Sequence, residues 1–290
     1  YADSEQDREK TLGIGGNPVN MAKLAQTAAL WGIGAVFLLP LYWLFVSSLK
    51  SDSEITRFPP TFWPKTLVWS NFPDIWEQLN FHVPFLNSLT VTLPTVFLTV
   101  LFSTMAGYAF SKKRFLGRDA LFFLLIATMI VPPTVLLLPL YFIITKLGMF
   151  DTLMGLIFPF SATVFAIFFT KQHIDDIPDE MLEAAKIDGS GDLRTFFTII
   201  VPLIRPALTA LVIIDAVQNW NSFTMPLVLL QSEANYTIPL KLALVTQDTV
   251  STPWSKILAA NLLSMIPVVA LFLSMQKHFE EGLMAGSVKG

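Results

Sequence analysis

The stretch EAAKIDGSGDLRTFFTIIVP (residues 183–202) is a short polar segment between two long apolar blocks of the chain. Just ahead of it, Pro178 and Asp179 predict the start of a helix, because proline suits the first helical position and an acid complements the positive end of the helix dipole. Gly189 predicts the end of this helix, since glycine readily adopts the left-handed backbone conformation that closes many helices. The sequence therefore predicts a short helix inside a polar loop.

One face of this loop helix carries small residues. The residues that share the face at helical spacing are Met181, Ala184, Ala185 and Asp188. The alanines would let another surface approach closely, and Glu183 and Lys186 flank them with opposite charges. Two interpretations stay open: an amphipathic helix lying on the membrane surface, or a helix that docks in a groove of another protein. The polar face lacks the many Lys and Arg residues that anionic lipid attracts, which favours docking.

The composition of the 290 residues indicates a membrane protein. Hydrophobic residues make up 53% of the chain and charged residues only 14%, where a soluble domain has about a quarter charged. The net charge is −3 and no basic stripe with interleaved aromatics occurs, which argues against nucleic-acid binding. Because the chain has no cysteine, disulfides, thiol nucleophiles and cysteine metal sites are excluded.

Six apolar segments are long enough to cross a bilayer, which requires about 20 residues. They cover residues 27–49, 83–110, 120–144, 153–170, 199–217 and 257–275. The adjacent Pro132 and Pro133 predict a break or strong bend in the third segment, because proline removes a helical hydrogen bond. The expected fold is an all-α membrane protein with six transmembrane helices, formed by residues 27–276.

Basic residues predict the orientation of these spans. The short loop 111–119 carries four positive charges, and positively charged loops stay on the cytoplasmic side. Both termini are then cytoplasmic, and the outer loops 50–82 and 221–256 face the other side. The cytoplasmic segments are the N-terminal tail 1–26, the loops 111–119 and 171–198, and the C-terminal tail 277–290.

The loop motif resembles the cytoplasmic loop of ABC-transporter permease subunits. The matching residues are Glu183-Ala184-Ala185, Gly189 and Ile199-Ile200-Val201-Pro202, with Val201 where leucine is usual. Four further segments are similar to the carbohydrate-importer branch, specifically the smaller permease subunit of maltose-type importers. They are FPPTFWP (58–64), FLNSLTVT (85–92), NWNSFTMPLVLL (219–230) and GLMAGSVKG (282–290). The resemblance implies the type I ABC importer permease fold.

The resemblance also implies partners in the bacterial or archaeal plasma membrane. They are a sister permease, two copies of a cytoplasmic ABC ATPase, an extracytoplasmic solute-binding protein, a carbohydrate substrate and the surrounding lipid. ATP and Mg would be bound by the ATPase subunits, and this chain contains no phosphate-binding Gly-x-x-x-x-Gly-Lys-Ser/Thr loop, so we expect no enzymatic activity, no catalytic residue and no cofactor in it.

By resemblance, three groups of residues contact these proteins. The loop helix becomes a coupling helix that binds the ATPase, through Glu183, Ala184, Ala185, Lys186, Asp188 and Gly189. The C-terminal tail, by itself a flexible segment, would reach between the ATPase subunits through Gly282, Leu283, Gly286, Lys289 and Gly290. The tip of the outer loop would contact the binding protein through Glu233, Asn235 and Tyr236.

Asp215 is the only acidic residue inside a predicted span, and intramembrane charges usually face a bundle interior or a water-filled path. It lies close in sequence to Gln218, Asn219, Trp220 and Asn221, and Asn87 and Ser88 are expected at a similar depth. This group of residues suits sugar hydroxyls and a stacked ring. An equal alternative is that the same residues form hydrogen bonds between helices.

Two other functions are compatible with a chain of apolar segments. An intramembrane enzyme would need a catalytic constellation, but the three histidines, His82, His173 and His278, lie outside the predicted spans, and neither a Gly-x-Ser-x-Gly elbow nor paired intramembrane carboxylates occur. No metal site is predicted either. An importer permease for a non-sugar solute would keep the same architecture and change only the ligand.

Overall fold

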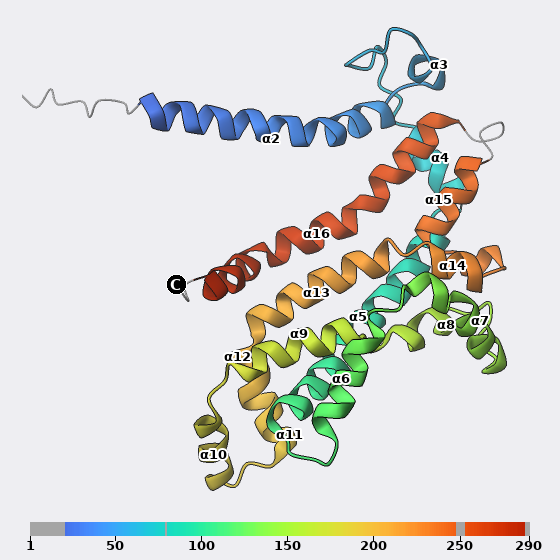
Figure 1. Cartoon of the computed structure of the whole chain (residues 1–290). Coiled ribbons are helices and arrows are strands. Elements are labelled where there is room, and N and C mark those ends of the chain that lie inside the picture. Colours follow the sequence, from blue (N-terminus) through green and yellow to red (C-terminus); the bar gives the residue numbers. More distant parts are fainter. Residues whose placement is uncertain (1–20, 79, 248–252, 288–290) are drawn as a thin grey trace, which may run out of the picture.

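The computed structural model describes residues 21–78, 80–247 and 253–287, and every regular element in these ranges is a helix. The longest are α2 (Met21–Ser48), α5 (His82–Lys112), α13 (Arg205–Trp220) and α16 (Trp254–Ser287). Helix α5 packs between α9 (Val164–Asp175) and α13, α13 packs on α16, and α16 contacts α2 (Figure 1). The centre of the molecule is therefore a row of neighbouring helices built around α5.

Among the described residues, four helices are long and apolar enough to cross a membrane: Lys23–Ser48, His82–Lys112, Met154–Asp175 and Trp254–Gln276. Two further pairs of helices pass the same test together, so the number of spans rises to six if each bent pair is one span. The four helices and the two bent pairs lie at the six apolar segments of the sequence. The first helix begins at Met21 rather than at residue 27.

The third apolar segment is broken, as the paired prolines predict. Helix α6 (Arg118–Thr128) is followed by the 3-10 turn η1 (Pro133–Leu136) and by α7 (Leu137–Lys146), and the two halves are bent by 95°. Pro132 has an extended backbone with ψ 133°. Because the residue before a proline is driven away from the helical conformation, Pro133 enforces this break.

The fifth segment differs from its prediction. Its helix α13 begins at Arg205, whereas the sequence predicted a span from residue 199. The preceding residues form α11 (Asp192–Thr195), the π-helical turn η3 (Phe196–Ile200) and α12 (Val201–Leu203), bent by 81° from α13. The bend falls at Ile204, before Pro206, which has no backbone N–H with which to continue the helical hydrogen bonding.

Short helices occupy the outer segments, which the sequence treated as loops. After α2 come α3 (Asp52–Ile55) and α4 (Asn71–Gln78), and α14 (Thr224–Leu229), η4 (Glu233–Asn235) and α15 (Ile238–Gln247) follow α13. In contrast, α8 (Met154–Ile157) and η2 (Phe158–Phe160) lie within the fourth predicted span, just ahead of α9. Buried residues of α8, α14 and α15, including Leu156, Leu229 and Leu240, form one apolar cluster with Val91 of α5. The outer end of the molecule is therefore packed.

Asp151 fixes part of this outer end. It lies between α7 and α8 with φ 56°, and its Oδ1 accepts hydrogen bonds of 2.9 Å from the backbone amides of Gln231 and Ser232. Its Oδ2 accepts from the Ser232 hydroxyl, and its carbonyl accepts from Asn235 at 2.5 Å. The Ser232 hydroxyl and the two amides hold the pKa of Asp151 well below its usual value. These bonds tie the η4 segment to the α7–α8 turn.

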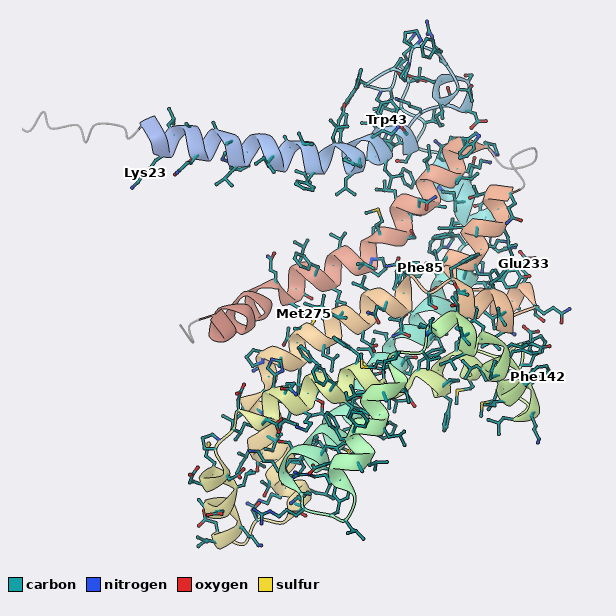
Figure 2. The ribbon with its side chains drawn as sticks, viewed as in Figure 1. Lys23, Trp43, Phe85, Phe142, Glu233 and Met275 are labelled. Carbon is teal, nitrogen blue, oxygen red and sulfur yellow. The ribbon has the colours of Figure 1, made fainter. Side chains whose placement is uncertain are left out.

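Helix α2 stands apart from the others along most of its length. Figure 2 shows its side chains projecting around the helix between Lys23 and Trp43. Large apolar side chains there are exposed, with Leu30, Trp31 and Phe37 each at least 70% accessible. In a protein whose helices cross a bilayer, such a surface is suited to lipid or to another apolar helix.

The α5–α9 contact depends on Gly107. A Cβ atom at this position would lie 2.5 Å from Thr170 Oγ1 and 2.9 Å from the Lys171 backbone nitrogen. The Thr170 hydroxyl crosses the same contact and donates to the Ser103 carbonyl at 3.0 Å. Small residues of this kind allow membrane helices to approach closely.

We expect Gly107→Ala to destabilise the protein by about 1–3 kcal/mol, because the new methyl group overpacks a contact bounded by backbone atoms. Thermal unfolding of the purified protein in one detergent would measure the change. Gly34→Ala on α2 is the matched control, since nothing lies within 4 Å of a Cβ there. Equal stability of the two variants would contradict the importance of this contact.

Candidate functional site

The predicted loop helix is present as α10 (Asp179–Ile187), at one end of the molecule and away from α14 and α15 (Figure 1). Gly189 terminates it with φ 79°. The Gly189 amide donates to the Lys186 carbonyl at 3.0 Å, and the Ser190 amide donates to the Ala185 carbonyl at 2.9 Å. This pair of hydrogen bonds is the Schellman motif, which explains why a glycine ends the helix.

The two faces of α10 differ from the prediction in one respect. Ala185 is buried, with 8% of its surface exposed, and so does not belong to the outward face. The reason is the spacing of three residues from Leu182, which packs against a buried cluster of α5, α9 and the π-helical turn. Glu183, Ala184, Lys186, Asp188 and Gly189 are exposed as predicted.

The outward face of α10 also carries large apolar side chains. Met181 is 42% exposed and Ile187 is 85% exposed. The sequence analysis did not single out Ile187, although its spacing of three residues from Ala184 places both on one face. An exposed apolar face on a charged helix suits contact with another protein.

Two lysines at the end of α5 hold the segment around α10. Lys112 Nζ, whose side chain is only 8% exposed, lies 2.7 Å from Asp179 Oδ1 and donates to the Ile177 carbonyl at 2.6 Å. Lys113 Nζ lies 2.5 Å from Asp192 Oδ1. The hydrogen bond from Lys112 lowers the pKa of the Asp179 carboxyl. The sequence analysis used these lysines only for orientation and missed this bracing role.

The C-terminal segment is helical rather than extended. Helix α16 continues to Ser287, so Gly282, Leu283 and Gly286 lie on a helix and not in a flexible tail. Lys289 and Gly290 fall outside the described residues, as do residues 1–20 of the predicted N-terminal tail.

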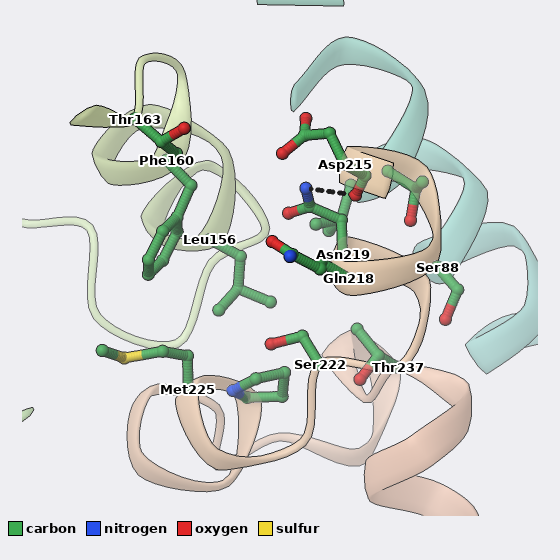
Figure 3. A pocket seen from close by; sticks show the side chains of 13 residues that line it. Ser88, Leu156, Phe160, Thr163, Asp215, Gln218, Asn219, Ser222, Met225 and Thr237 are labelled. Atoms are coloured by element: carbon green, nitrogen blue, oxygen red, sulfur yellow. Dashed lines mark hydrogen bonds between the residues drawn. The ribbon is translucent and has the colours of Figure 1, made fainter. Parts of the chain in front are cut away.

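A polar cavity of about 190 Å³ lies among α5, α13 and the outer short helices. Figure 3 shows Asp215, Gln218 and Asn219 of α13 facing Leu156 and Phe160 across it. The other lining residues are Ser88, Val91, Thr92, Thr163, Ser222, Met225, Pro226 and Thr237. Asp215 is the only ionisable side chain among the lining residues.

Four of the predicted path residues line this cavity: Ser88, Asp215, Gln218 and Asn219. The polar residues that the sequence analysis missed are Thr92, Thr163, Ser222 and Thr237. Thr92 lies four residues after Ser88, and Ser222 four residues after Gln218, so helical spacing could have found these two. Thr163 and Thr237 come from other elements and required the tertiary structure.

Asn87, Trp220 and Asn221 do not line the cavity. The Asn87 amide donates to the carbonyls of Ala234 and Tyr236, at 2.7 and 3.0 Å. Trp220 donates from Nε1 to the Ser264 carbonyl at 2.9 Å, with its ring edge-on to Phe85. Asn221 donates to the Val217 carbonyl of its own helix. The alternative of hydrogen bonds between helices therefore describes Asn87 and Trp220, whereas Asn221 bonds within its own helix.

Three buried polar atoms of the cavity residues have no hydrogen-bond partner in the part of the chain that the structure describes. They are Thr92 Oγ1, Asp215 Oδ2 and Thr237 Oγ1, each from a residue that is 5% exposed. Burying a polar group without a hydrogen bond is costly, and such groups in native proteins usually meet water or a ligand. The cavity is therefore suited to a polar molecule.

The outer segment uses most of its polar groups internally. The Asn235 amide donates to Asp151, and the Tyr236 hydroxyl donates to the Gln231 carbonyl at 3.0 Å. Glu233 pairs with Lys241, yet 68% of its side chain stays accessible. Of the three predicted contact residues, Glu233 thus presents the largest free surface, at the edge of the molecule (Figure 2). No cluster of His, Asp or Glu suited to a metal ion occurs among the described residues.

The chain is similar to solved transporter structures. A bacterial ABC transporter involved in the import of the acidic polysaccharide alginate superposes with a TM-score of 0.76 and 25% identity, over 90% of this chain and 98% of that one. The alginate transporter in complex with an alginate pentasaccharide-bound periplasmic protein gives a TM-score of 0.61 at 14% identity, over 88% of this chain and 94% of that one. The second similarity supports the fold alone.

Sequence relatives span nearly the whole chain. The arabinooligosaccharides transport system permease protein AraQ of Bacillus subtilis is 32% identical, over 92% of this chain and 96% of the relative. The melibiose/raffinose/stachyose import permease protein MelC of the same species is 32% identical over 89% and 94%. The sn-glycerol-3-phosphate transport system permease protein UgpE of Pectobacterium atrosepticum is 33% identical over 87% and 92%.

A family model matches residues 99–284, which include both α10 and Asp215. The relatives are transport permeases, and the predicted resemblance to ABC-transporter permease subunits is confirmed. The chain belongs to the family of binding-protein-dependent transport system inner membrane components.

Proposed function

We propose that this chain is the transmembrane permease subunit of an ABC importer and that, together with a sister permease, it forms the translocation path for a sugar or oligosaccharide. The observation that carries the proposal is the polar cavity beside α5 and α13, whose three unpartnered polar atoms suit a hydroxyl-rich solute. The names of AraQ and MelC, which refer to oligosaccharides, support the same substrate class.

The proposed topology has six spans with both termini in the cytoplasm. The two bent helix pairs would form the third and fifth spans, and the basic loop between α5 and α6 supports a cytoplasmic position for that end of the molecule. The exposed apolar surface of α2 would then meet lipid or the sister permease.

The proposed energy source is a pair of cytoplasmic ATPase subunits that bind ATP and Mg. One of them would contact the outward face of α10, which exposes Met181, Ala184 and Ile187. Lys112 joins the start of α10 to the end of α5, and α5 also lines the cavity through Ser88 and Thr92. From Thr92 to Lys112 the helix covers about 30 Å, at 1.5 Å per residue. Movement of α10 would thereby reach the cavity through one continuous helix.

The proposed role of the outer surface is to contact an extracytoplasmic solute-binding protein. The η4 segment is exposed at Glu233 and is held in place by Asp151 and Asn87. A fixed surface of this kind can be recognised with little cost in conformational entropy. The solved complex of the alginate transporter with its periplasmic protein is the structural parallel.

Affinity purification of the chain from its native membrane, followed by mass spectrometry, tests the proposal. A second permease and an ATPase with a phosphate-binding loop should copurify. After reconstitution into vesicles with the binding protein, the complex should take up a sugar only when ATP is supplied. Purification of the chain without an ATPase, or uptake of amino acids in place of sugars, would refute the proposal.

The turn at Gly189 generates a further prediction. We expect Gly189→Val to lower ATP-driven uptake, because a β-branched residue in the left-handed conformation costs roughly 1–2 kcal/mol and would distort the end of α10. Gly189→Asn is the matched control, since asparagine tolerates this conformation. No atom lies within 4 Å of an added Cβ, so crowding inside the chain is not the cause. Equal uptake by the two variants would disprove the role of this turn.

The Lys112 contact predicts a loss of coupling. We expect Lys112→Met to keep the assembled complex but to lower the amount of sugar imported per ATP hydrolysed several-fold, because α10 would lose its hydrogen bonds to the end of α5. Parallel assays of ATPase activity and uptake give this ratio. Lys146→Met, at the exposed end of α7, is the control. An unchanged ratio in Lys112→Met would contradict transmission through α5.

A further inference from the structure

We infer that the cavity beside Asp215 selects an uncharged sugar ring and disfavours anionic sugars such as uronates and sugar phosphates. This inference rests on the proposed function and narrows its substrate class. Family membership leaves the charge of the solute open, because the relatives include UgpE, named for sn-glycerol-3-phosphate, and the structural neighbour imports acidic alginate. The lining of the cavity distinguishes between these possibilities.

The first argument is the charge of the lining. No lysine, arginine or histidine is among the lining residues, and Asp215 supplies the only ionisable group. The nearby Asn219 amide donates to the Asp215 backbone carbonyl at 2.9 Å, and neither it nor any other polar lining residue carries a positive charge. A carboxylate or phosphate on the ligand would meet this acid in a site of low dielectric, where repulsion between like charges is strong. The cations that normally bind such groups are missing from the lining.

The second argument is hydrogen bonding. Asp215 Oδ2, when ionised, can only accept hydrogen bonds, whereas the hydroxyls of Thr92 and Thr237 can both donate and accept. All three atoms are buried and without a partner in the described chain. Sugar hydroxyls also donate and accept, so one neutral ring can satisfy all three kinds of contact. A carboxylate or phosphate group offers only acceptors, so it cannot itself pair with the ionised Asp215.

The third argument is the shape of the cavity. Its α13 side carries Asp215 and Asn219, while Leu156 and Phe160 form an apolar wall opposite (Figure 3). A sugar ring has polar edges and apolar C–H faces, so its two kinds of surface match the two walls. The cavity volume of about 190 Å³ is below the range of pockets for drug-sized ligands, which favours a single ring over a longer segment of an oligosaccharide.

Equilibrium binding to the purified importer complex in nanodiscs, without ATP and without binding protein, tests this inference. The probes are two neutral sugars, arabinotriose and raffinose, and two anions, sn-glycerol-3-phosphate and an alginate trisaccharide, titrated by saturation-transfer NMR. We expect at least one neutral sugar to bind and both anions to bind at least 10-fold more weakly. Asp215→Asn should weaken neutral-sugar binding by about 10-fold, because a charge-assisted hydrogen bond is lost.

Two further variants keep the test decisive if Asp215→Asn fails to assemble. Gln218→Lys places a cation at the accessible mouth of the cavity and should strengthen alginate binding by at least several-fold. Ser103→Ala is the matched control, because Ser103 Oγ is likewise buried and unpartnered but is not among the lining residues. It should leave all four affinities unchanged.

The possible outcomes distinguish a failure of the charge selectivity from a failure of the proposed sugar-importer function. Tight binding of an anion by the natural chain, or an unchanged neutral-to-anion ratio in Gln218→Lys, would overturn the charge selectivity and leave the sugar-importer proposal standing. Binding of none of the four probes, together with import of a non-sugar solute, would overturn the proposed function and this inference with it.

Discussion

Two adjacent lysines at the end of α5, Lys112 and Lys113, bind the acids that begin the helices on either side of the Gly189 turn. Asp179 starts α10 and Asp192 starts α11, so each ion pair also places an acid at the positive end of a helix dipole. The exposed loop is thereby attached at two points to the helix that lines the cavity. These contacts add to the packing of Leu182 of α10 against the buried cluster of α5, α9 and the π-helical turn.

The interior of the protein is organised by the need to satisfy polar groups away from water. The hydroxyl of Thr170, a residue with no exposed surface, donates to backbone carbonyls. The Asn71 amide donates to two carbonyls near the end of α2. At the exposed outer end, Asp151 likewise accepts hydrogen bonds from two amides of the outer segment. Thr92 Oγ1, Asp215 Oδ2 and Thr237 Oγ1 are exceptions, because they have no hydrogen-bond partner among the described residues. Buried polar atoms without a protein partner often mark sites where water or a ligand binds.

Much of the local structure could be predicted from the sequence because it depends on single residues. Pro133 breaks the third apolar segment through its own ring, and Gly189 ends α10 through its own backbone. Asp215 could be selected because an acid in an apolar segment is conspicuous. The sequence misplaced Ala185 because the buried side of α10 depends on Leu182 meeting residues of α5 and α9.

The rest of the candidate site could not be predicted because it, too, depends on contacts between segments that are far apart in the sequence. Thr163 and Thr237 reach the cavity only because α9 and the outer segment fold back against α5 and α13. Asn87 resembled Ser88 in polarity and depth, but its amide is used by two carbonyls of the outer segment. The bend at Ile204 could not be predicted because the apolar pattern continues through it. The helical C-terminal segment was not predicted because its small residues are typical of a flexible tail.

The close contact at Gly107 has a kinematic consequence. Because Thr170 Oγ1 and the Lys171 backbone nitrogen of α9 leave no space for even one methyl group there, sliding of α5 past α9 would first require the two helices to separate. The contact therefore opposes relative sliding of these two helices during a conformational change. Relative rotation has to be taken up elsewhere, and the 81° bend at Ile204 is a change of helix direction that lies outside this contact.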